Sequence, residues 1–224
     1  MTAYELIIFD CDGVLIDSEG ISKKTLMAQL RELGITIDDA YFIKNCLGRS
    51  FAHVKQSLLA DFKVLLPDDF EQTHQTALVK DFERELVVTP DIKWLLGELT
   101  INFCLATSSS RPRTLNALRI TGLNEYFSDN IFTTSEVANG KPAPDLFLHA
   151  AKSMGVAAEK CLVFEDSLSG IQAAKSAGMT VCRYIGGSHL LSAEANLMAE
   201  QSDYLAFRHW RDLSKLVPSL ISNK

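Results

Sequence analysis

Apolar residues in this 224-residue chain gather in short runs, and each run stops at polar or small residues. Four of these runs cover residues 6–9, 101–106, 161–164 and 180–185. They lack the strict alternation of a half-exposed strand, which is typical of parallel strands covered on both faces. The pattern therefore predicts at least four buried strands, each with a polar cluster at its carboxyl end.

Helical patterns separate these runs. Residues 111–122 carry Pro112 in first-turn position and Gly122 as a stop, and residues 144–155 run from Asp145, interpreted as a helix cap, to Gly155. A third helix is expected in residues 167–178. Strand–helix alternation of this kind predicts an α/β fold, a doubly wound, Rossmann-like parallel sheet. Ligands bind such sheets at the carboxyl ends of the strands, where the polar clusters fall.

One segment breaks the alternation. From about residue 18 to 86 the apolar residues follow helical spacing throughout, as in Ile21, Leu26 and Leu30. We therefore expect a core domain made of residues 1–17 and 87–224, with an inserted all-helical cap domain of residues 18–86. The two crossings, residues 15–18 and 87–90, are the expected hinges.

Composition narrows the class of protein. With 47% hydrophobic and 22% charged residues the chain reads as globular, and a net charge of −6 without a basic stripe argues against nucleic acid as the partner. No run approaches the roughly 18 apolar residues of a membrane span. Five cysteines without CxxC spacing and an N-terminus without a signal-peptide pattern favour a cytoplasmic protein, expected as a monomer or weak dimer.

The first apolar run ends in an unusual polar sequence, in which Asp10 and Asp12 are followed by Gly13. Residues two apart on an extended chain face the same side, so both carboxylates reach one crevice, and glycine lets the chain turn away. Two carboxylates in a desolvated site repel each other unless a cation joins them. The pattern thus indicates a site that holds a cation.

Four motifs in order resemble those of the haloacid dehalogenase superfamily, and they span almost the whole chain. "DCDGVLIDSE" at residues 10–19 resembles its first motif, and Thr107 in "LATSSS" resembles its second. Lys141 in "GKPAPDLF" resembles the third, and "FEDSLSGIQAAKSAG" at residues 164–178 the fourth. Within the superfamily the chain resembles the helical-cap (C1) sugar-phosphatase or β-phosphoglucomutase-like branch, which implies a phosphoric monoester hydrolase.

The resemblance assigns a role to each motif. It implies that Asp10 is the nucleophile, which becomes an aspartyl phosphate. Asp12 corresponds to the general acid and base, and Lys141 to the cation that balances charge on Asp10 and the phosphoryl group. Thr107, with the amides of Ser108 and Ser109 at a helix start, would hold the phosphoryl oxygens.

The same resemblance implies a metal site. Asp10, the backbone carbonyl of Asp12, Asp166 and Glu165 would form an all-oxygen set of hard ligands, which suits Mg²⁺. Glu165 would bind either directly or through a water molecule. A cation among these carboxylates would also explain why the chain tolerates their repulsion.

Two alternatives remain open at this point. The family contains a sugar-phosphate mutase with a histidine near the start of its first cap helix, and Ser22 occupies that place here. A receiver-type signalling domain also carries a phosphorylated aspartate in a doubly wound sheet, but such domains are about half as long and lack the helical insertion. The dehalogenase branch of the family lacks an acidic residue corresponding to Asp12, so the presence of Asp12 favours phosphoryl chemistry over dehalogenation.

The cap is expected to choose the substrate. Arg49, in "CLGRS" at residues 46–50, sits where the family places its specificity loop and could bind a carboxylate or a second phosphate. This loop and "GGSH" at residues 186–189 resemble those of bacterial sugar phosphatases, although a simple turn is the favoured interpretation of "GGSH". The expected partner is a small phosphorylated metabolite, a sugar or sugar-acid phosphate.

Overall fold

The computed structural model describes residues 4–47, 49, 51–190 and 204–222. Its centre is a six-stranded sheet in the order β3-β2-β1-β4-β5-β6, with every neighbouring pair parallel. The strands are β1 (Leu6–Phe9), β2 (Asn102–Thr107), β3 (Ile131–Thr133), β4 (Cys161–Glu165), β5 (Thr180–Tyr184) and β6 (Leu205–Phe207). The predicted doubly wound α/β fold is confirmed.

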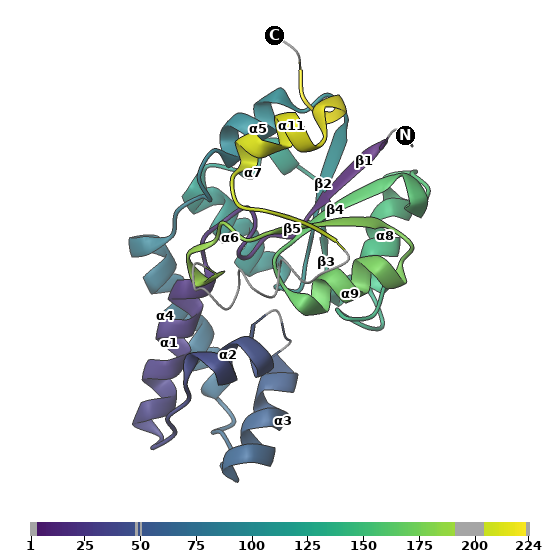
Figure 1. Ribbon diagram of the computed structural model, residues 1–224. Helices are drawn as coiled ribbons and strands as arrows, with labels where there is room; N and C mark the ends of the chain where they lie inside the picture. The colour runs from purple at the N-terminus through teal and green to yellow at the C-terminus, as the bar shows by residue number, and fades with distance from the viewer. Residues whose placement is uncertain (1–3, 48, 50, 191–203, 223–224) are drawn as a thin grey trace.

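Two layers of helices cover the two faces of this sheet (Figure 1). Alternate residues of β1 separate the faces, because Ile7 and Phe9 pack in one apolar cluster while Leu6 and Ile8 pack in the other. The first cluster includes residues of α5 (Ile92–Glu98), α6 (Arg111–Thr121), α7 (Asn124–Phe127) and α11 (Leu213–Leu216). The second includes residues of α8 (Asp145–Ser153) and α9 (Leu168–Ser176).

Short 3₁₀ turns complete the core. Of the two helix boundaries predicted at Gly122 and Asp145, the stop of α6 is confirmed and the cap of α8 is wrong. The turns are η1 (Thr134–Glu136), η2 (Ala158–Lys160), η3 (Ser188–Leu190), η4 (Trp210–Asp212) and η5 (Pro218–Leu220). Helix α6 ends at Gly122, whose φ of 64° is left-handed, as predicted. Asp145 is not a cap: Pro144 holds that position, and the Asp145 carboxylate accepts a hydrogen bond from Asn139 Nδ2 at 3.1 Å.

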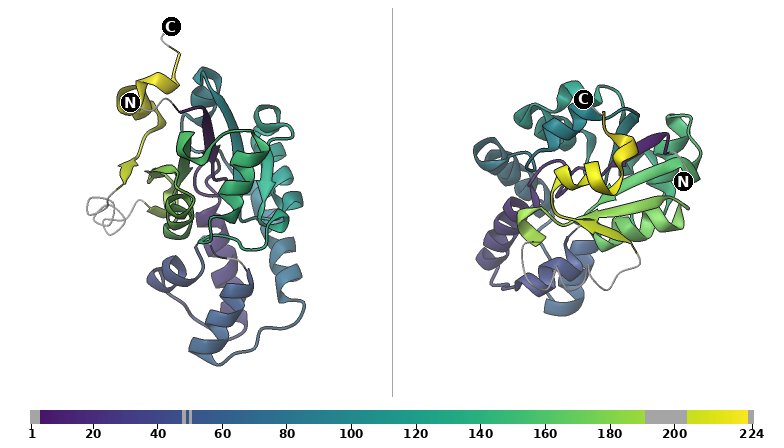
Figure 2. Two further views of the ribbon diagram at one scale, coloured as in Figure 1. Left: turned by 90° about the vertical axis from the view of Figure 1, so that its right-hand side faces the viewer. Right: turned by 45° about the horizontal axis from the view of Figure 1, so that its top comes forward.

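The described part of residues 18–86 contains only helices and their connections, and it lies beyond the carboxyl edge of the sheet (Figures 1 and 2). The helices are α1 (Glu19–Glu32), α2 (Asp39–Asn45), α3 (Phe51–Phe62) and α4 (Phe70–Glu85). Their outer part has its own apolar cluster, which includes Leu30, Phe42 and Leu58. At the base, Ile21 and Phe82 belong to the cluster of the core. The exact boundaries of the cap remain a prediction.

The sheet order determines where a ligand can bind. Strand β1 lies at the centre, with β2 on one side and β4 on the other, so the connections diverge there and leave a crevice at its carboxyl end. Asp10 follows β1 at this point. Among the described residues, no helix combines the length and the apolar character needed to cross a lipid bilayer.

Candidate active site

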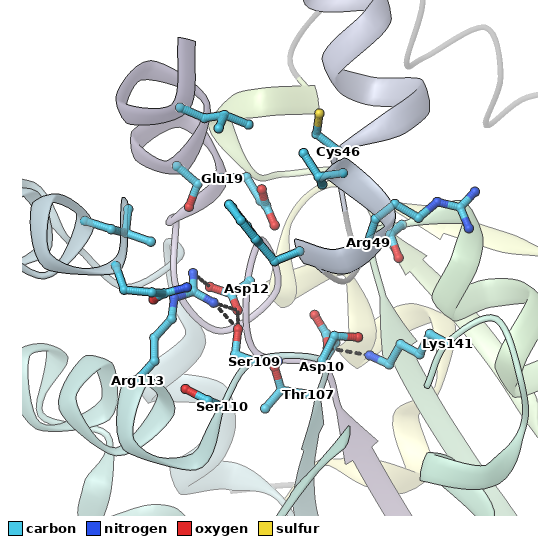
Figure 3. Close-up of a pocket in the computed structure, with 18 of the residues that line it drawn as sticks. Asp10, Asp12, Glu19, Cys46, Arg49, Thr107, Ser109, Ser110, Arg113 and Lys141 are labelled. Carbon is cyan, nitrogen blue, oxygen red and sulfur yellow. Dashed lines mark hydrogen bonds and ion pairs between the residues drawn. The ribbon is translucent and has the colours of Figure 1, made fainter. Parts of the chain in front are cut away.

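A cavity of about 430 Å³ lies between the carboxyl edge of the sheet and the cap (Figure 3). The loops that follow β1, β2 and β4 form its floor. Its opposite wall comes from the cap and includes Glu19, Ser22, Arg49, Phe51, Glu71 and His74. All the site residues predicted from the sequence line this one cavity, including the more distant Arg49.

Asp10 and Lys141 form a buried ion pair on the floor of this cavity. Lys141 Nζ lies 2.5 Å from Asp10 Oδ1 and 2.7 Å from Glu165 Oε1, and it also donates to the carbonyl of Ala106 at 3.2 Å. The lysine comes from the loop before α8, while the carboxylates follow β1 and end β4. Three segments far apart in the sequence thus meet at one cation.

Three buried carboxylates converge beside this lysine. Asp10, Glu165 and Asp166 each offer an oxygen within 4.8 Å of the others. Burial raises the pKa of Asp10 well above its ordinary value; Lys141 opposes this increase, whereas Glu165 and Asp166 add to it. One lysine therefore leaves the cluster with excess negative charge. The donors are all oxygen atoms, and the excess negative charge can be balanced by a hard divalent cation. The cluster could therefore hold a metal ion.

Glu165 is held more tightly than its neighbours. Its Oε2 accepts hydrogen bonds from the amides of Asp166 and Ser167, at 2.9 and 2.8 Å, and from the Ser167 hydroxyl at 3.0 Å. These donors lie at the start of α9, where amides have no partner within the helix. A Cβ atom on Gly170 would lie only 1.7 Å from Glu165 Oε1. The carboxylate is therefore fixed on both sides.

Asp12 has a cation of its own, which the sequence interpretation missed. Arg113 donates from Nη2 to Asp12 Oδ1 at 2.9 Å and from Nη1 to Oδ2 at 3.0 Å, and Nη1 also contacts the Ser109 hydroxyl (Figure 3). The hydroxyls of Ser18 and Ser109 donate to the two oxygens at 2.6 and 2.7 Å. Burial alone would raise the pKa of Asp12, but Arg113 and these hydroxyls lower it overall.

One sequence signal could have identified Arg113. It lies in the first turn of α6, and a cation there opposes the helix dipole, which favours negative charge at an N-terminus. An unfavourable charge at such a position, directly after the polar loop that follows β2, indicates a role outside the helix itself. Nothing in the apolar pattern predicts where its long side chain ends.

The loop after β2 has the expected place beside Asp10. Thr107 is the last residue of β2 and is buried, while Ser108 and Ser109 precede α6 and line the cavity. The amide of Ser109 donates to Thr107 Oγ1 at 3.1 Å, so in this structure that amide is not free for an anion. Figure 3 shows Thr107 and Ser109 directed toward the two aspartates.

The turn predicted for "GGSH" is present, but the sequence interpretation missed that His189 within it contacts the site. His189 lies in η3, after β5, and its Nε2 is 2.8 Å from Asp166 Oδ2, with both side chains buried. A Cβ atom on Gly13, whose φ is +78°, would lie 2.2 Å from Asp166 Oδ2 and 2.9 Å from the histidine ring. Glycine at this position therefore lets the two side chains approach the chain after Asp12.

Arg49 lies on the cap side of the cavity, and its guanidinium extends away from Asp10 and Asp12 (Figure 3). Two other residues of the predicted specificity loop, Gly48 and Ser50, lie outside the described residues. Ser22 lines the cavity at the place where the mutase would carry a histidine.

Comparison with known proteins agrees with this geometry. The profile of the haloacid dehalogenase-like hydrolases matches residues 4–178. The chain is 28% identical over 190 residues to the 6-phosphogluconate phosphatase of Escherichia coli, covering 84% of this chain and 86% of the relative. It is 32% identical over 193 residues to a phosphorylated carbohydrates phosphatase of Thermotoga maritima, covering 84% and 87% of the two chains.

A solved structure matches nearly the whole fold. It is that of a conserved haloacid dehalogenase-like protein of unknown function from Agrobacterium tumefaciens, with a TM-score of 0.83 and 30% identity, covering 97% of this chain and 99% of the other. Both the sequence profile and the three-dimensional likeness include the core and the helical insertion. The chain therefore belongs to the haloacid dehalogenase-like hydrolases, and within them to the phosphoric monoester hydrolases that carry a helical cap.

Proposed function

We propose that the protein is a Mg²⁺-dependent phosphatase that hydrolyses a small phosphorylated sugar or sugar acid through an aspartyl-phosphate intermediate. The observation that carries this proposal is the buried arrangement at the end of β1. There Asp10 pairs with Lys141 beside two further carboxylates, and Asp12 lies two residues away in the same cavity. Such a site offers a nucleophile, a proton donor and charge neutralisation together.

In this proposal Asp10 attacks phosphorus, so that a bond forms between its carboxylate oxygen and phosphorus while the bond to the ester oxygen breaks. Asp12 must first take up a proton, because Arg113 and two hydroxyls lower its pKa, and it then gives this proton to the departing alkoxide. It then takes a proton from the water that attacks the phosphoryl group, which releases phosphate and regenerates Asp10. Lys141 balances the negative charge of the transferring group. The hydroxyls of Thr107 and Ser108 are available to the phosphoryl oxygens.

Asp10, Asp166 and the carbonyl of Asp12 are the proposed direct ligands of Mg²⁺. We place Glu165 behind a metal-bound water molecule, because one of its oxygens already accepts three hydrogen bonds and the other pairs with Lys141. When bound, the ion would neutralise the phosphoryl oxygens and help to orient them for attack.

Three features support a sugar or sugar-acid phosphate as the substrate. The cavity of about 430 Å³ exceeds the needs of a phosphoryl group alone, and its cap wall carries polar and charged side chains. Arg49 on this wall could bind a carboxylate. Two relatives are named as phosphatases of 6-phosphogluconate and of phosphorylated carbohydrates. The mutase alternative is disfavoured, because Ser22 cannot take the part of a histidine in proton transfer.

The test is phosphate release from a panel of phosphorylated sugars and sugar acids, with and without Mg²⁺. We expect hydrolysis of at least one metabolite with Mg²⁺, loss of activity in excess EDTA, and loss of several orders of magnitude in Asp10→Asn. Isomerised sugar phosphate without free phosphate would favour the mutase. Substantial Mg²⁺-dependent hydrolysis by Asp10→Asn would exclude the proposed mechanism.

We also propose a cytoplasmic enzyme that is a monomer or a weak dimer and uses neither nucleic acid nor membrane as a partner. All five cysteines are free and buried, as suits reduced thiols in the core. Light scattering during gel filtration measures the oligomeric state, and a stable assembly larger than a dimer would contradict this part of the proposal.

A further inference from the structure

Arg113 is a nearly buried cation whose position the proposed reaction does not explain. Its side chain is 16% exposed, and its guanidinium lies between Asp12 and the cap, with Cζ 5.2 Å from the centre of the Phe82 ring. It also stands at the N-terminal end of α6, where the helix dipole disfavours a cation. The helix gains nothing from this charge, and the contacts of the guanidinium with Asp12 and Ser109 lie at the cavity.

Asp12 does not need Arg113 to satisfy its hydrogen bonds. Ser18 already donates to one of its oxygens and Ser109 to the other. Arg113, in contrast, has unused capacity: its Nε is buried and has no hydrogen-bond partner among the described residues. A buried donor without an acceptor is unfavourable unless a ligand supplies one.

The geometry places the leaving group of the substrate beside this guanidinium. A proton donor must come within about 2.6–3.2 Å of the ester oxygen. Arg113 lies 2.9 and 3.0 Å from the two oxygens of Asp12, so the ester oxygen falls within about 6 Å of the guanidinium. An oxygen on the carbon adjacent to the ester carbon is therefore within reach of the Arg113 guanidinium.

The same geometry requires an exchange of partners. Both Asp12 oxygens accept from Arg113 as well as from a serine, so one of these bonds must open before Asp12 can reach the ester oxygen. An acceptor on the substrate can replace the Asp12 oxygen at the guanidinium. The Nη donor released by Asp12 then keeps a partner.

We propose that Arg113 binds an oxygen on the carbon adjacent to the ester carbon, which is the carbon bonded to the phosphate oxygen. Arg113 thereby selects metabolites that have a hydroxyl on this adjacent carbon, or a carboxylate in its place, over plain alkyl phosphates. This inference rests on the phosphatase function proposed above. It makes Arg113, on the core side, a specificity residue independent of Arg49 on the cap.

Three small probes test the chemistry without knowledge of the natural metabolite. On the carbon adjacent to the ester carbon, glycerol 3-phosphate carries a hydroxyl. In 2-phosphoglycolate this adjacent carbon is the carboxylate carbon, and in n-propyl phosphate it bears no oxygen. In Arg113→Ala we expect kcat/KM to fall about ten- to a hundredfold for the hydroxyl or carboxylate probe that the wild type prefers, the range for losing a hydrogen bond to a charged group. The loss on propyl phosphate should be clearly smaller. The probe with the larger loss identifies the recognised oxygen.

Arg113→Lys keeps the charge without the planar fork and should recover only part of the selectivity. Arg111→Ala is the matched control: this arginine lies in the same turn, but its side chain is more exposed and donates to the carbonyl of Ile131 at 2.9 Å. We expect this control to keep the wild-type selectivity. Circular dichroism and thermal unfolding would show that each variant is folded.

Other patterns of loss would overturn the proposal. Equal losses on all three alkyl probes, with p-nitrophenyl phosphate less affected, would mean that Arg113 only positions Asp12. Equal losses on every phosphate would assign it a structural role, and no loss would leave it as a partner of Asp12 alone.

A binding experiment separates this inference from the phosphatase function. Calorimetric titration of Asp10→Asn with the same three probes measures recognition without turnover. We expect the oxygen-bearing probe to bind more tightly than propyl phosphate, and this preference to disappear in Asp10→Asn with Arg113→Ala. Equal affinities for all probes in Asp10→Asn would overturn the inference even if the wild type is an active phosphatase. A wild type without phosphatase activity would refute the proposed function instead.

Discussion

At the scale of residues, each of the two aspartates after β1 is paired with its own cation. The two environments shift the pKa values of the carboxyl groups in opposite directions. Burial raises the pKa of Asp10 in spite of Lys141, whereas Arg113 and two hydroxyls outweigh burial and lower the pKa of Asp12. Because a nucleophilic carboxylate must be ionised, the Asp10 site needs more positive charge than Lys141 supplies. A divalent cation would provide it, so metal binding and loss of the Asp10 proton should be coupled.

The metal ligands can be ranked by substitution. Asp166→Asn should weaken Mg²⁺ binding about a hundredfold or more, because it removes a charged direct ligand. Glu165→Gln should weaken it about tenfold, the effect of an outer-shell group, since its carboxylate is already held by Lys141 and the start of α9. Calorimetric titration with Mg²⁺ measures both affinities. A larger loss in Glu165→Gln would mean that Glu165 is the direct ligand.

Gly170 should be indispensable for this arrangement. Gly170→Ala would place a methyl group within 1.7 Å of Glu165 Oε1, so the carboxylate must leave its place beside Lys141. We expect at least a tenfold loss of kcat together with weaker Mg²⁺ binding. Gly97→Ala in α5 is the control, because nothing lies within 4 Å of its new Cβ, and it should leave activity intact. Full activity of Gly170→Ala would show that Glu165 can move without consequence.

The residues of the site divide into those that a sequence pattern can predict and those that it cannot. Asp10, Thr107 and Glu165 follow or end buried strands, and parallel strands bring such positions to one edge of the sheet. Arg113 and His189 reach the site only through a long side chain and a 3₁₀ turn. Their contacts depend on how α6 and the segment after β5 are oriented, which periodicity does not determine.

At the scale of elements, the four strands expected from apolar runs are present, and two more were missed. Strand β3 has only three residues, too few to distinguish from a loop by pattern. Strand β6 also has three residues, but residues 204–207 are all apolar, so this run could have been recognised. Both strands form because a neighbouring strand supplies hydrogen bonds along its edge. The prediction for Asp145 is wrong for a different reason: Pro144 takes the N-cap position, so α8 begins at Asp145, one residue earlier than expected.

The cap helix α4 should make the stability of the protein depend on pH. His74 is buried beside the rings of Phe51 and Phe70, and burial, followed by the charge of Arg113, lowers its pKa to about 4. In the unfolded chain its pKa is about 6.5, so the unfolded state binds more protons between these values. Stability is therefore fully present above pH 6.5 and falls as pH decreases toward 4, by about 2 kcal/mol between pH 7.5 and 5.

His74→Phe keeps a ring in this stack and removes the titrating group. Urea unfolding at pH 7.5 and pH 5.0 measures the two stabilities, and the variant should lose less stability on acidification than the wild type. Carboxylates contribute equally to both proteins and cancel in this comparison. The same loss in both proteins would mean that His74 does not control the pH response.

At the scale of the whole molecule, the helical insertion places a polar wall over a site built by the core. Its outer part has a separate apolar cluster, while its base shares the cluster of the core through Ile21 and Phe82. The long helical stretch was visible in the sequence, but this shared base was not, because helical spacing does not show against which partner a face packs.

Arg49 should matter only for substrates large enough to reach the cap. Arg49→Ala should lower kcat/KM for the best metabolite by roughly ten- to a thousandfold, because contacts made on closure use binding energy far from phosphorus. Hydrolysis of p-nitrophenyl phosphate, which leaves the cap wall empty, should change only slightly. Equal losses on both substrates would assign Arg49 to the fold or the core site, and no loss on a broad panel would make it a solvated arginine.

The central claim is that Asp10 carries the phosphoryl group during turnover. Its most direct test is to quench the enzyme during hydrolysis of its best substrate with Mg²⁺, reduce the acyl phosphate with borohydride, and locate the modified residue by mass spectrometry of the peptides. The account predicts reduction at residue 10 and at no other aspartate, and none in Asp10→Asn. A phosphoryl group on another residue, or full turnover by Asp10→Asn, would contradict it.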